Sequence, residues 1–264
     1  MRFETIKFEA ADGIATITLN RPERLNAMSW AMEDELVEAW ATVKRDPSII
    51  VAIVTGAGDR AFSSGLDVSA MPGEDGPPKD LVARVDRELK FTAIQNQCWK
   101  PVITAVNGMA VGGALELVAE SDIVIAADHA TFFDTHAKIG LVSTYAAIVL
   151  ARRMPLESVL RMVLMGGRER INAQRAYEIG LVSEVVPGDT LLERAREIAR
   201  LLLQNSPSTM MASKKAVWES LRYGLGDALE RGRSFVRAHI DHPDWKEGAQ
   251  AFREKRAPRW APPS

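Results

Sequence analysis

The pattern with the clearest chemical meaning lies in residues 100–116, KPVITAVNGMAVGGALE. An uncharged run rich in β-branched residues predicts a buried strand, and Gly112 and Gly113 then predict a turn and a helix start. A helix N-terminus leaves backbone N–H groups unpaired, and these suit an anion or an oxygen that becomes negative during a reaction. We expect Glu116 in the first turn of that helix, where a carboxylate can transfer a proton or hold a water.

A purely structural interpretation of the same stretch stands beside the chemical one. Gly112 and Gly113 would then only let a helix pack closely on a strand, and Glu116 would only complement the helix dipole. Short glycine motifs match by chance often, so this stretch alone leaves both interpretations open.

Strands and helices alternate around this stretch and are predicted to position it. Period-two alternation and runs of β-branched residues predict strands, and apolar residues at helical spacing predict helices. Ser29 is a predicted N-cap for a helix ending near Lys44, and Asn172 for a helix ending at Ile179. Strands are predicted in 3–20, 49–54, 123–126, 131–133 and 181–186, and helices in 81–97, 146–153, 156–164 and, with breaks at Pro207 and Pro243, from 191 onward. Residues 71–79, with two glycines and three prolines, are predicted to form a loop.

Composition excludes several classes of protein. The chain has 264 residues, a formal net charge of −2 and 47% hydrophobic residues, so it can bury a sizeable core and has no basic excess for nucleic acid. Its single cysteine, Cys98, rules out an internal disulfide and fits a reducing compartment. No apolar signal core is present at the N-terminus, and the longest uncharged run, 102–115, is too short for a membrane span. We therefore expect a soluble, cytoplasmic protein that binds neither nucleic acid nor membrane.

Other motifs are weaker. Gly56, Gly58 and Ala61 match a dinucleotide fingerprint in spacing, but no helical period follows them. Neither a Gly-x-Ser-x-Gly elbow nor a phosphate-loop lysine occurs. His239, Asp241, His242 and Asp244 form a possible metal cluster at a helix end, but no other ligand set supports it, and Asp244 is also a predicted N-cap for the last helix. No metal site is predicted.

Six blocks of sequence share an order with one known family. They are LNA at 25–27, VTGAGDRAFSSGLD at 54–67, the 100–116 stretch, SDI at 121–123, INAQRAYEIGLV at 171–182 and EGAQAFREKR at 247–256. On these blocks the chain resembles the crotonase (enoyl-CoA hydratase/isomerase) superfamily over nearly its whole length.

The resemblance implies an α/β fold and a substrate class. The fold would be a spiral of ββα turns in residues 1–190, with two roughly perpendicular sheets that bind and transform an acyl-CoA thioester. Residues 191–264 would form a helical C-terminal region that builds homotrimers or dimers of trimers and covers the active site. No cofactor is implied, since coenzyme A is part of the substrate.

The same resemblance implies site residues. The backbone N–H groups of Leu66 and Gly113 would hold the thioester oxygen, and Glu116 corresponds to the first catalytic glutamate of the family's hydratases. Contacts to the substrate or its coenzyme A would come from Arg24, Leu25, Ala27, Ser64, Gly65, Asp67, Gly112, Thr144, Tyr145 and Lys255.

The chain departs from the family at the second glutamate. His136 occupies that position, and the glycine-rich turn after it is changed to STYAA at 143–147. A histidine can act as acid or base near neutral pH, so Glu116 and His136 could divide the work on one water. Alternatively His136 only binds and Glu116 works alone, or Asp134 or Tyr145 substitutes as the acid. In a structural interpretation, His136 is a partly buried histidine bonded to backbone.

The expected function is therefore an enoyl-CoA hydratase, which adds water to a 2-enoyl-CoA through an enolate. The alternatives on the same fold are an enoyl-CoA isomerase and a hydrolase of thioester or carbon–carbon bonds. A further alternative is a non-catalytic acyl-CoA-binding protein.

Overall fold

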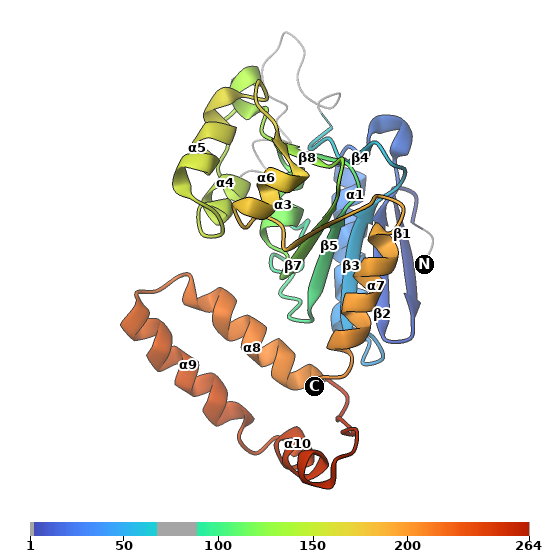
Figure 1. The fold of residues 1–264 in the computed structure, drawn as a ribbon, viewed down its shortest axis with the longest axis vertical. Helices are drawn as coiled ribbons and strands as arrows, with labels where there is room; N and C mark the ends of the chain where they lie inside the picture. The colour runs from blue at the N-terminus through green and yellow to red at the C-terminus, as the bar shows by residue number, and fades with distance from the viewer. Residues whose placement is uncertain (1–2, 68–88, 264) are drawn as a thin grey trace.

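Two sheets organise the chain in a computed structural model that describes residues 3–67 and 89–263 (Figure 1). Within those residues the larger sheet has the order β1-β2-β3-β5-β7-β10 and the smaller sheet the order β4-β6-β8-β9. The larger sheet consists of β1 (Ile6–Ala11), β2 (Ile14–Leu19), β3 (Val51–Gly56), β5 (Val102–Val106), β7 (Ile123–Ala127) and β10 (Glu184–Val186). The smaller consists of β4 (Ala61–Ser63), β6 (Met109–Val111), β8 (Thr131–Phe133) and β9 (Ile171–Asn172). All pairings are parallel except β1–β2 and β8–β9.

The helices follow and separate these strands. They are α1 (Trp30–Arg45), α3 (Ala114–Ala119), α4 (Tyr145–Leu150), α5 (Leu156–Met165), α6 (Ala173–Glu178), α7 (Leu191–Leu202), α8 (Pro207–Ser220), α9 (Leu225–His239) and α10 (Pro243–Glu254). In the described ranges, short 3-10 helices span Pro22–Arg24 and His136–Ile139. Ser29 and Asn172 accept hydrogen bonds from Met32 N and Arg175 N, which confirms both as N-caps.

The core lies on both faces of the larger sheet. Every residue of β3 and of β5 is buried, as expected of parallel strands covered on both sides. Helix α7 packs against β3, β5 and β7, so the first helix after residue 190 covers the sheet (Figure 1). None of the helices within the described ranges is long and apolar enough to cross a membrane.

The helix predicted for residues 81–97 is wrong in its described part. Residues 93–97 form turns, while 81–88, like the loop predicted at 71–79, lie outside the described residues. The cause is local, because the Gln95 side chain accepts hydrogen bonds from Phe91 N and Thr92 N, and Asn96 donates to the carbonyls of Lys90 and Thr92. Such side-chain bonds to backbone compete with the helical ladder.

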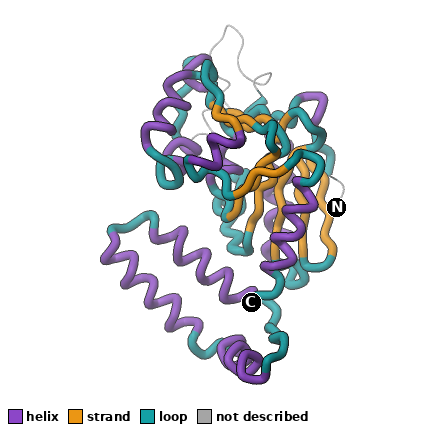
Figure 2. The backbone as a smooth tube through the Cα atoms, viewed as in Figure 1, coloured by secondary structure: helices purple, strands orange, loops and turns teal. Residues whose placement is uncertain are grey.

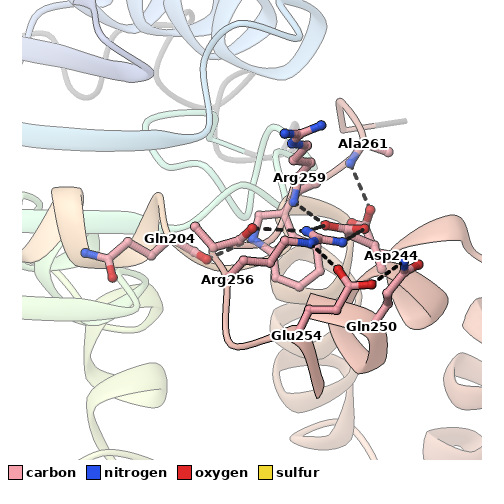
Figure 3. Close-up of polar contacts among 10 residues, drawn as sticks. Gln204, Asp244, Gln250, Glu254, Arg256, Arg259 and Ala261 are labelled. Atoms are coloured by element: carbon pink, nitrogen blue, oxygen red, sulfur yellow. Dashed lines mark hydrogen bonds and ion pairs between the residues drawn. The ribbon is translucent and has the colours of Figure 1, made fainter. Parts of the chain in front are cut away.

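Two further predictions in the C-terminal region are wrong. An unpredicted break at residues 221–224 separates α8 from α9. The N-cap of α10 is His242, whose ring Nδ1 accepts from Asp244 N, because Pro243 fills the first helical position. Asp244 instead accepts hydrogen bonds from Ser206 Oγ and from Ala261 N (Figure 3).

Helices α8, α9 and α10, here called the C-terminal arm, extend away from the two sheets (Figure 2). The arm is tied to the core where Trp218 Nε1 and Lys214 Nζ each lie 2.8 Å from a carboxylate oxygen of Asp122. The chain end folds back on α10, where Arg256 pairs with Glu247 at 2.6 Å (Figure 3). The arm is therefore attached to the core through the C-terminal half of α8.

Candidate active site

The turn between β6 and α3 has the form that the glycines predicted. Gly112 has φ +53°, in the left-handed region, and α3 begins two residues later at Ala114. Glu116 lies in the first turn of α3, and all six residues of this helix are buried. Arg153 holds the other end of α3, because its guanidinium donates to the carbonyls of Val118, Ala119 and Ser121.

Two backbone N–H groups meet beside this turn. A Cβ placed on Gly113 would lie 3.6 Å from Leu66 N, and one placed on Gly65 would lie 3.3 Å from Gly113 N, so the two amides are neighbours. Neither Leu66 N nor Gly113 N donates a hydrogen bond within residues 3–67 and 89–263. Paired free donors of this kind suit one oxygen atom that carries negative charge.

The chain around Leu66 is held by the segment before α1. Met28 N donates to Gly65 O at 2.8 Å, and Asp67 N donates to Met28 O at 3.0 Å. Arg21 pairs with Asp67 at 2.9 Å and donates to the Ala27 carbonyl at 2.7 Å. The hydrogen bonds that the structure shows for Ala27, Gly65 and Asp67 are thus to nearby segments of the same chain, and they fix the position of the Leu66 amide.

Glu116 is a buried carboxyl with one hydrogen-bond donor. Its side chain is 6% exposed, and Gln95 Nε2 donates to its Oε2 at 3.0 Å. The pKa of Glu116 is raised from 4.5 to about 7. Burial is the largest cause, and the carboxylates of Glu120 and Glu33 also raise it. The Gln95 hydrogen bond and the charge of His136 oppose that rise in pKa. Near neutral pH the carboxyl can therefore both accept and return a proton.

His136 forms a pair with Asp134. The Asp134 carboxylate, 1% exposed, lies 2.9 Å from His136 Nδ1 and accepts from His136 N at 2.8 Å and Ser143 Oγ at 2.9 Å. That hydrogen bond raises the pKa of His136, although burial opposes the rise. Burial also favours a higher pKa for Asp134, but the hydrogen bonds and charge of His136 outweigh it and lower that pKa. With Nδ1 bound to Asp134, Nε2 is the ring nitrogen that has no hydrogen-bond partner among residues 3–67 and 89–263.

One cavity joins these groups. It has a volume of about 360 Å³, and a Cβ on Gly112 would lie 3.4 Å from His136 Cε1, so the imidazole lies directly over the turn. The lining includes seven of the predicted residues: Leu66, Gly112, Gly113, Glu116, His136, Thr144 and Tyr145. It also includes Trp30, Leu89, Leu141, Val142, Ser143 and Ala146.

The other predicted contacts lie outside this lining. Leu25 and Ser64 bond to each other through Ser64 N and the Leu25 carbonyl, beside the Leu66 segment. Arg24 is exposed. Lys255 is exposed at the end of α10, and Figure 1 places α10 at the far end of the molecule from α3 and α4.

Sequence reasoning gave a different role to one residue and missed another. Asp134, a possible substitute acid in the sequence analysis, is the hydrogen-bond partner of His136. The Asp-x-His spacing in the sequence could have indicated this contact. Gln95 was missed because its segment was predicted to be helical, and no local pattern links it to Glu116, 21 residues away. In the described part of the chain no three His, Cys, Asp or Glu side chains are grouped to hold a metal ion.

Comparisons with known proteins agree with the six sequence blocks. The family model described as enoyl-CoA hydratase/isomerase matches residues 9–263. The (E)-benzylidenesuccinyl-CoA hydratase of Thauera aromatica is 35% identical over 264 residues, covering 96% of this chain and 97% of that protein. The carnitinyl-CoA dehydratase of Escherichia coli (strain K12) is 33% identical over 261 residues, covering 97% of this chain and 98% of that one.

Solved structures show the same likeness in three dimensions. An enoyl-CoA hydratase/isomerase from Mycobacterium paratuberculosis superposes with a TM-score of 0.91 at 41% identity, covering 98% of this chain and 99% of that one. An enoyl-CoA hydratase from Bacillus anthracis gives a TM-score of 0.85 at 30% identity, covering 97% and 99%. The predicted fold class is thereby confirmed.

Proposed function

The chain belongs to the enoyl-CoA hydratase/isomerase family of the crotonase superfamily, and from this premise we propose that it hydrates a 2-enoyl-CoA thioester. The observation that carries the proposal is the grouping, around one cavity, of two free backbone donors, a buried carboxyl and an Asp–His pair. Each of these has a distinct task in adding water to a conjugated double bond.

The two backbone donors would hold the thioester oxygen. Attack of water on the β-carbon moves the electrons of the double bond toward that oxygen, which becomes an enolate. The N–H groups of Leu66 and Gly113 are adjacent and free to donate to it. In a site shielded from water, removing one such donor typically costs about 3 kcal/mol of transition-state stabilisation.

Glu116 and His136 would move the protons. The Glu116 carboxylate takes a proton from the water as its oxygen bonds to the β-carbon, and the protonated His136 gives a proton from Nε2 to the α-carbon. The substrate gains one water in total. The proton on Glu116 then returns to His136 through solvent, which restores both groups. Asp134 keeps the imidazole oriented and favours its protonated form.

The two pKa values define a working pH range. Glu116 must be ionised, and because its pKa is about 7, activity should fall as pH drops below that value. His136 must be protonated, and Asp134 raises its pKa, so activity should fall again at higher pH. The interacting pair gives two apparent values that belong to both groups together.

The cavity favours an uncharged acyl group. Trp30, Leu66, Leu89, Leu141 and Val142 supply its apolar wall. The ionisable residues among the described lining are Glu116, His136 and Tyr145, and no lysine or arginine is among them. We propose an apolar aliphatic or aromatic acyl chain as the group that binds there.

Coenzyme A binding and assembly complete the proposal. Exposed Arg24 remains a candidate contact for the phosphates of coenzyme A. Lys255, on the C-terminal arm, would serve a neighbouring subunit of a homotrimer or dimer of trimers. Support for assembly comes from the large apolar side chains exposed on α9, namely Leu225, Leu229 and Val236.

Isomerisation is the second candidate, and one observation favours it. A carboxyl with a pKa of about 7 can take a proton from one carbon and return it to another without help. Glu116 would then act alone, with the Asp134–His136 pair serving only to bind substrate.

The test follows the ultraviolet absorbance of a short conjugated enoyl-CoA with purified protein, and product masses from a panel of chain lengths. Hydration removes the conjugated absorbance and adds one water to the mass. Glu116→Gln and His136→Gln should both abolish this change. Glu120→Gln is the matched control, since Glu120 is the C-cap residue of the same helix, is bonded to Thr92, and is absent from the cavity lining.

The outcomes separate the candidates. Unchanged mass with a moved double bond, retained in His136→Gln, would replace hydration by isomerisation. Release of free coenzyme A would indicate a hydrolase. Binding of every enoyl-CoA without any product would leave an acyl-CoA-binding protein.

A further inference from the structure

We propose that Gln95 is a positioning residue that holds Oε2 of Glu116, so that Oε1 is the oxygen that exchanges a proton with the bound water. This role rests on the proposed function for its water, but the contact between Gln95 and Glu116 does not. Gln95 belongs to the turn of residues 93–97 and is not among the residues that line the cavity.

The orientation of the Gln95 amide is fixed by its surroundings. Its carbonyl Oε1 accepts from Phe91 N at 2.8 Å and from Thr92 N at 3.1 Å. A flipped amide would place its NH₂ group against these two N–H donors and its oxygen against the carboxyl of Glu116. The unflipped amide therefore points its NH₂ group at Glu116 Oε2, 3.0 Å away.

The turn that carries Gln95 is itself anchored. Trp40 Nε1 donates to the Phe91 carbonyl at 2.9 Å, and the Phe91 side chain is fully buried. Thr92 Oγ1 donates to Glu120, the C-cap residue of α3, four residues after Glu116. The turn thus contacts α3 at two carboxyl groups on one face, and this fixes the distance from Gln95 to Glu116.

The consequence for proton transfer follows from the two oxygens of Glu116. Oε2 accepts from Gln95, so when the carboxyl is neutral its proton is placed on Oε1. Within the described residues Oε1 accepts no hydrogen bond, and Glu116 lines the cavity. The proton therefore enters and leaves on the oxygen that no protein group occupies.

Several groups change the pKa of Glu116, and Gln95 lowers this pKa whereas most of the others raise it. Burial raises the pKa of Glu116, and Glu120 at the C-cap of α3 and Glu33 on α1 raise it further. The hydrogen bond from Gln95 lowers it, as does the charge of His136. Loss of the Gln95 amide should thus leave the carboxyl harder to ionise and less well oriented.

The experiment compares Gln95→Met, which keeps the length of the side chain but removes the amide, with Asn96→Ala. Asn96 bonds to the carbonyls of Lys90 and Thr92 beside the same turn, and its hydrogen bonds in the described residues do not include Glu116, so it is the matched structural control. Two readings are taken for each variant. One is the titration of the Glu116 carboxyl by carbon-13 NMR, assigned with Glu116→Gln, and the other is the pH profile of kcat/KM with a short enoyl-CoA.

In Gln95→Met we expect the Glu116 titration and the acid limb of the profile to move together to higher pH. At pH 6, kcat/KM should fall about tenfold with KM nearly unchanged. Asn96→Ala should move neither reading, even if its melting temperature falls. An unmoved titration in Gln95→Met, or an equal movement in Asn96→Ala, would overturn the proposal.

The NMR titration needs no substrate, which separates this proposal from the proposed function. If no enoyl-CoA is hydrated while the titration still moves in Gln95→Met, hydration is wrong and the hold of Gln95 on Glu116 stands. If hydration is confirmed and the titration does not move, only the role of Gln95 is wrong.

Discussion

Helices α3 and α9 use apolar residues in opposite ways. The six residues of α3 are all buried, and Arg153 bonds to the carbonyls at its C-terminal end. None of the fifteen residues of α9 is buried, and its large apolar side chains are exposed, Leu229 by 60% and Val236 by 59%. Burial of apolar surface fixes a helix in place, so α3 is positioned by its packing within this chain, whereas α9 presents apolar surface that the described residues leave exposed.

The difference separates chemistry from assembly. Groups that must be placed to a fraction of an ångström, such as Glu116, lie on the fully packed helix. Side chains available for contact with another copy lie on α9 of the C-terminal arm, whereas the core contacts this arm at Lys214, Trp218 and Leu221. Changes at α3 should therefore alter the reaction rate and its pH dependence, and changes at α9 should alter the mass of the assembly in solution.

The largest effect is expected from Glu116→Gln. Loss of a general base typically lowers the rate by 10²- to 10⁴-fold, and we expect kcat/KM for the enoyl-CoA to fall about 10³-fold. The glutamine keeps the size of the side chain and can still accept from Gln95, so the circular dichroism spectrum should not change. A variant within about tenfold of the wild-type rate would remove Glu116 from the chemistry and break the contrast with α9.

The same variant should be more stable than the wild type at alkaline pH. Because the pKa of Glu116 is raised from 4.5 to about 7, ionising it costs the fold about 3 kcal/mol. That cost is absent below pH 4.5, grows between 4.5 and 7, and is complete above 7. Urea unfolding of both proteins at pH 4 and at pH 8 measures it.

At pH 8 the unfolding free energy of Glu116→Gln should exceed that of the wild type. At pH 4 this advantage should be absent. An identical difference between the two proteins at both pH values would contradict the raised pKa and the burial that causes it.

Asp134→Asn should have a smaller effect that acts through His136. The asparagine cannot stabilise the imidazolium, so the pKa of His136 falls and the alkaline limb of the kcat/KM profile moves to lower pH. We expect kcat to fall about 10²-fold with little change in KM. Ser143→Ala removes only one donor to Asp134 and should cost about threefold. Equal losses in the two variants would argue for a packing role of this pair.

The smallest effect on catalysis is expected on α9. Leu229→Ser combined with Val236→Ser removes apolar side chains of a kind worth about 1.5 to 3 kcal/mol each when buried. Sedimentation should show a lower mass at micromolar concentration, while kcat stays within about twofold. Glu230→Gln, which breaks the exposed Arg233–Glu230 pair on the same helix, is the control and should keep the wild-type mass. An unchanged mass in the double variant would exclude this face from assembly.

The parts of the fold with local signals could be predicted from sequence. The β6–α3 turn has Gly112 in the left-handed region that favours glycine, and Ser29 and Asn172 have residue types that predict N-caps. Glu116 and the Leu66 and Gly113 amides came from a resemblance in block order, and the structure brings them to one cavity.

The parts that depend on distant partners could not be predicted. Gln95 donates to the carboxyl of Glu116, 21 residues away, and no local pattern links the two. Asp244 was predicted to cap α10, and only the fold brings Ser206 to its carboxylate, 38 residues away. No periodicity records such contacts, because each needs two segments to meet in space.

The main-chain origin of the two free amides has a consequence for how this protein can change. A backbone donor survives replacement of its own side chain, so Leu66 can be varied to reshape the cavity while the Leu66 N–H stays in place. Gly65 has no such freedom, since a Cβ there would lie 2.6 Å from the Val111 carbonyl oxygen. Libraries that randomise Leu66, Leu141 and Val142 but keep Gly65, Gly112 and Gly113 should therefore explore new acyl groups without losing the grip on the carbonyl.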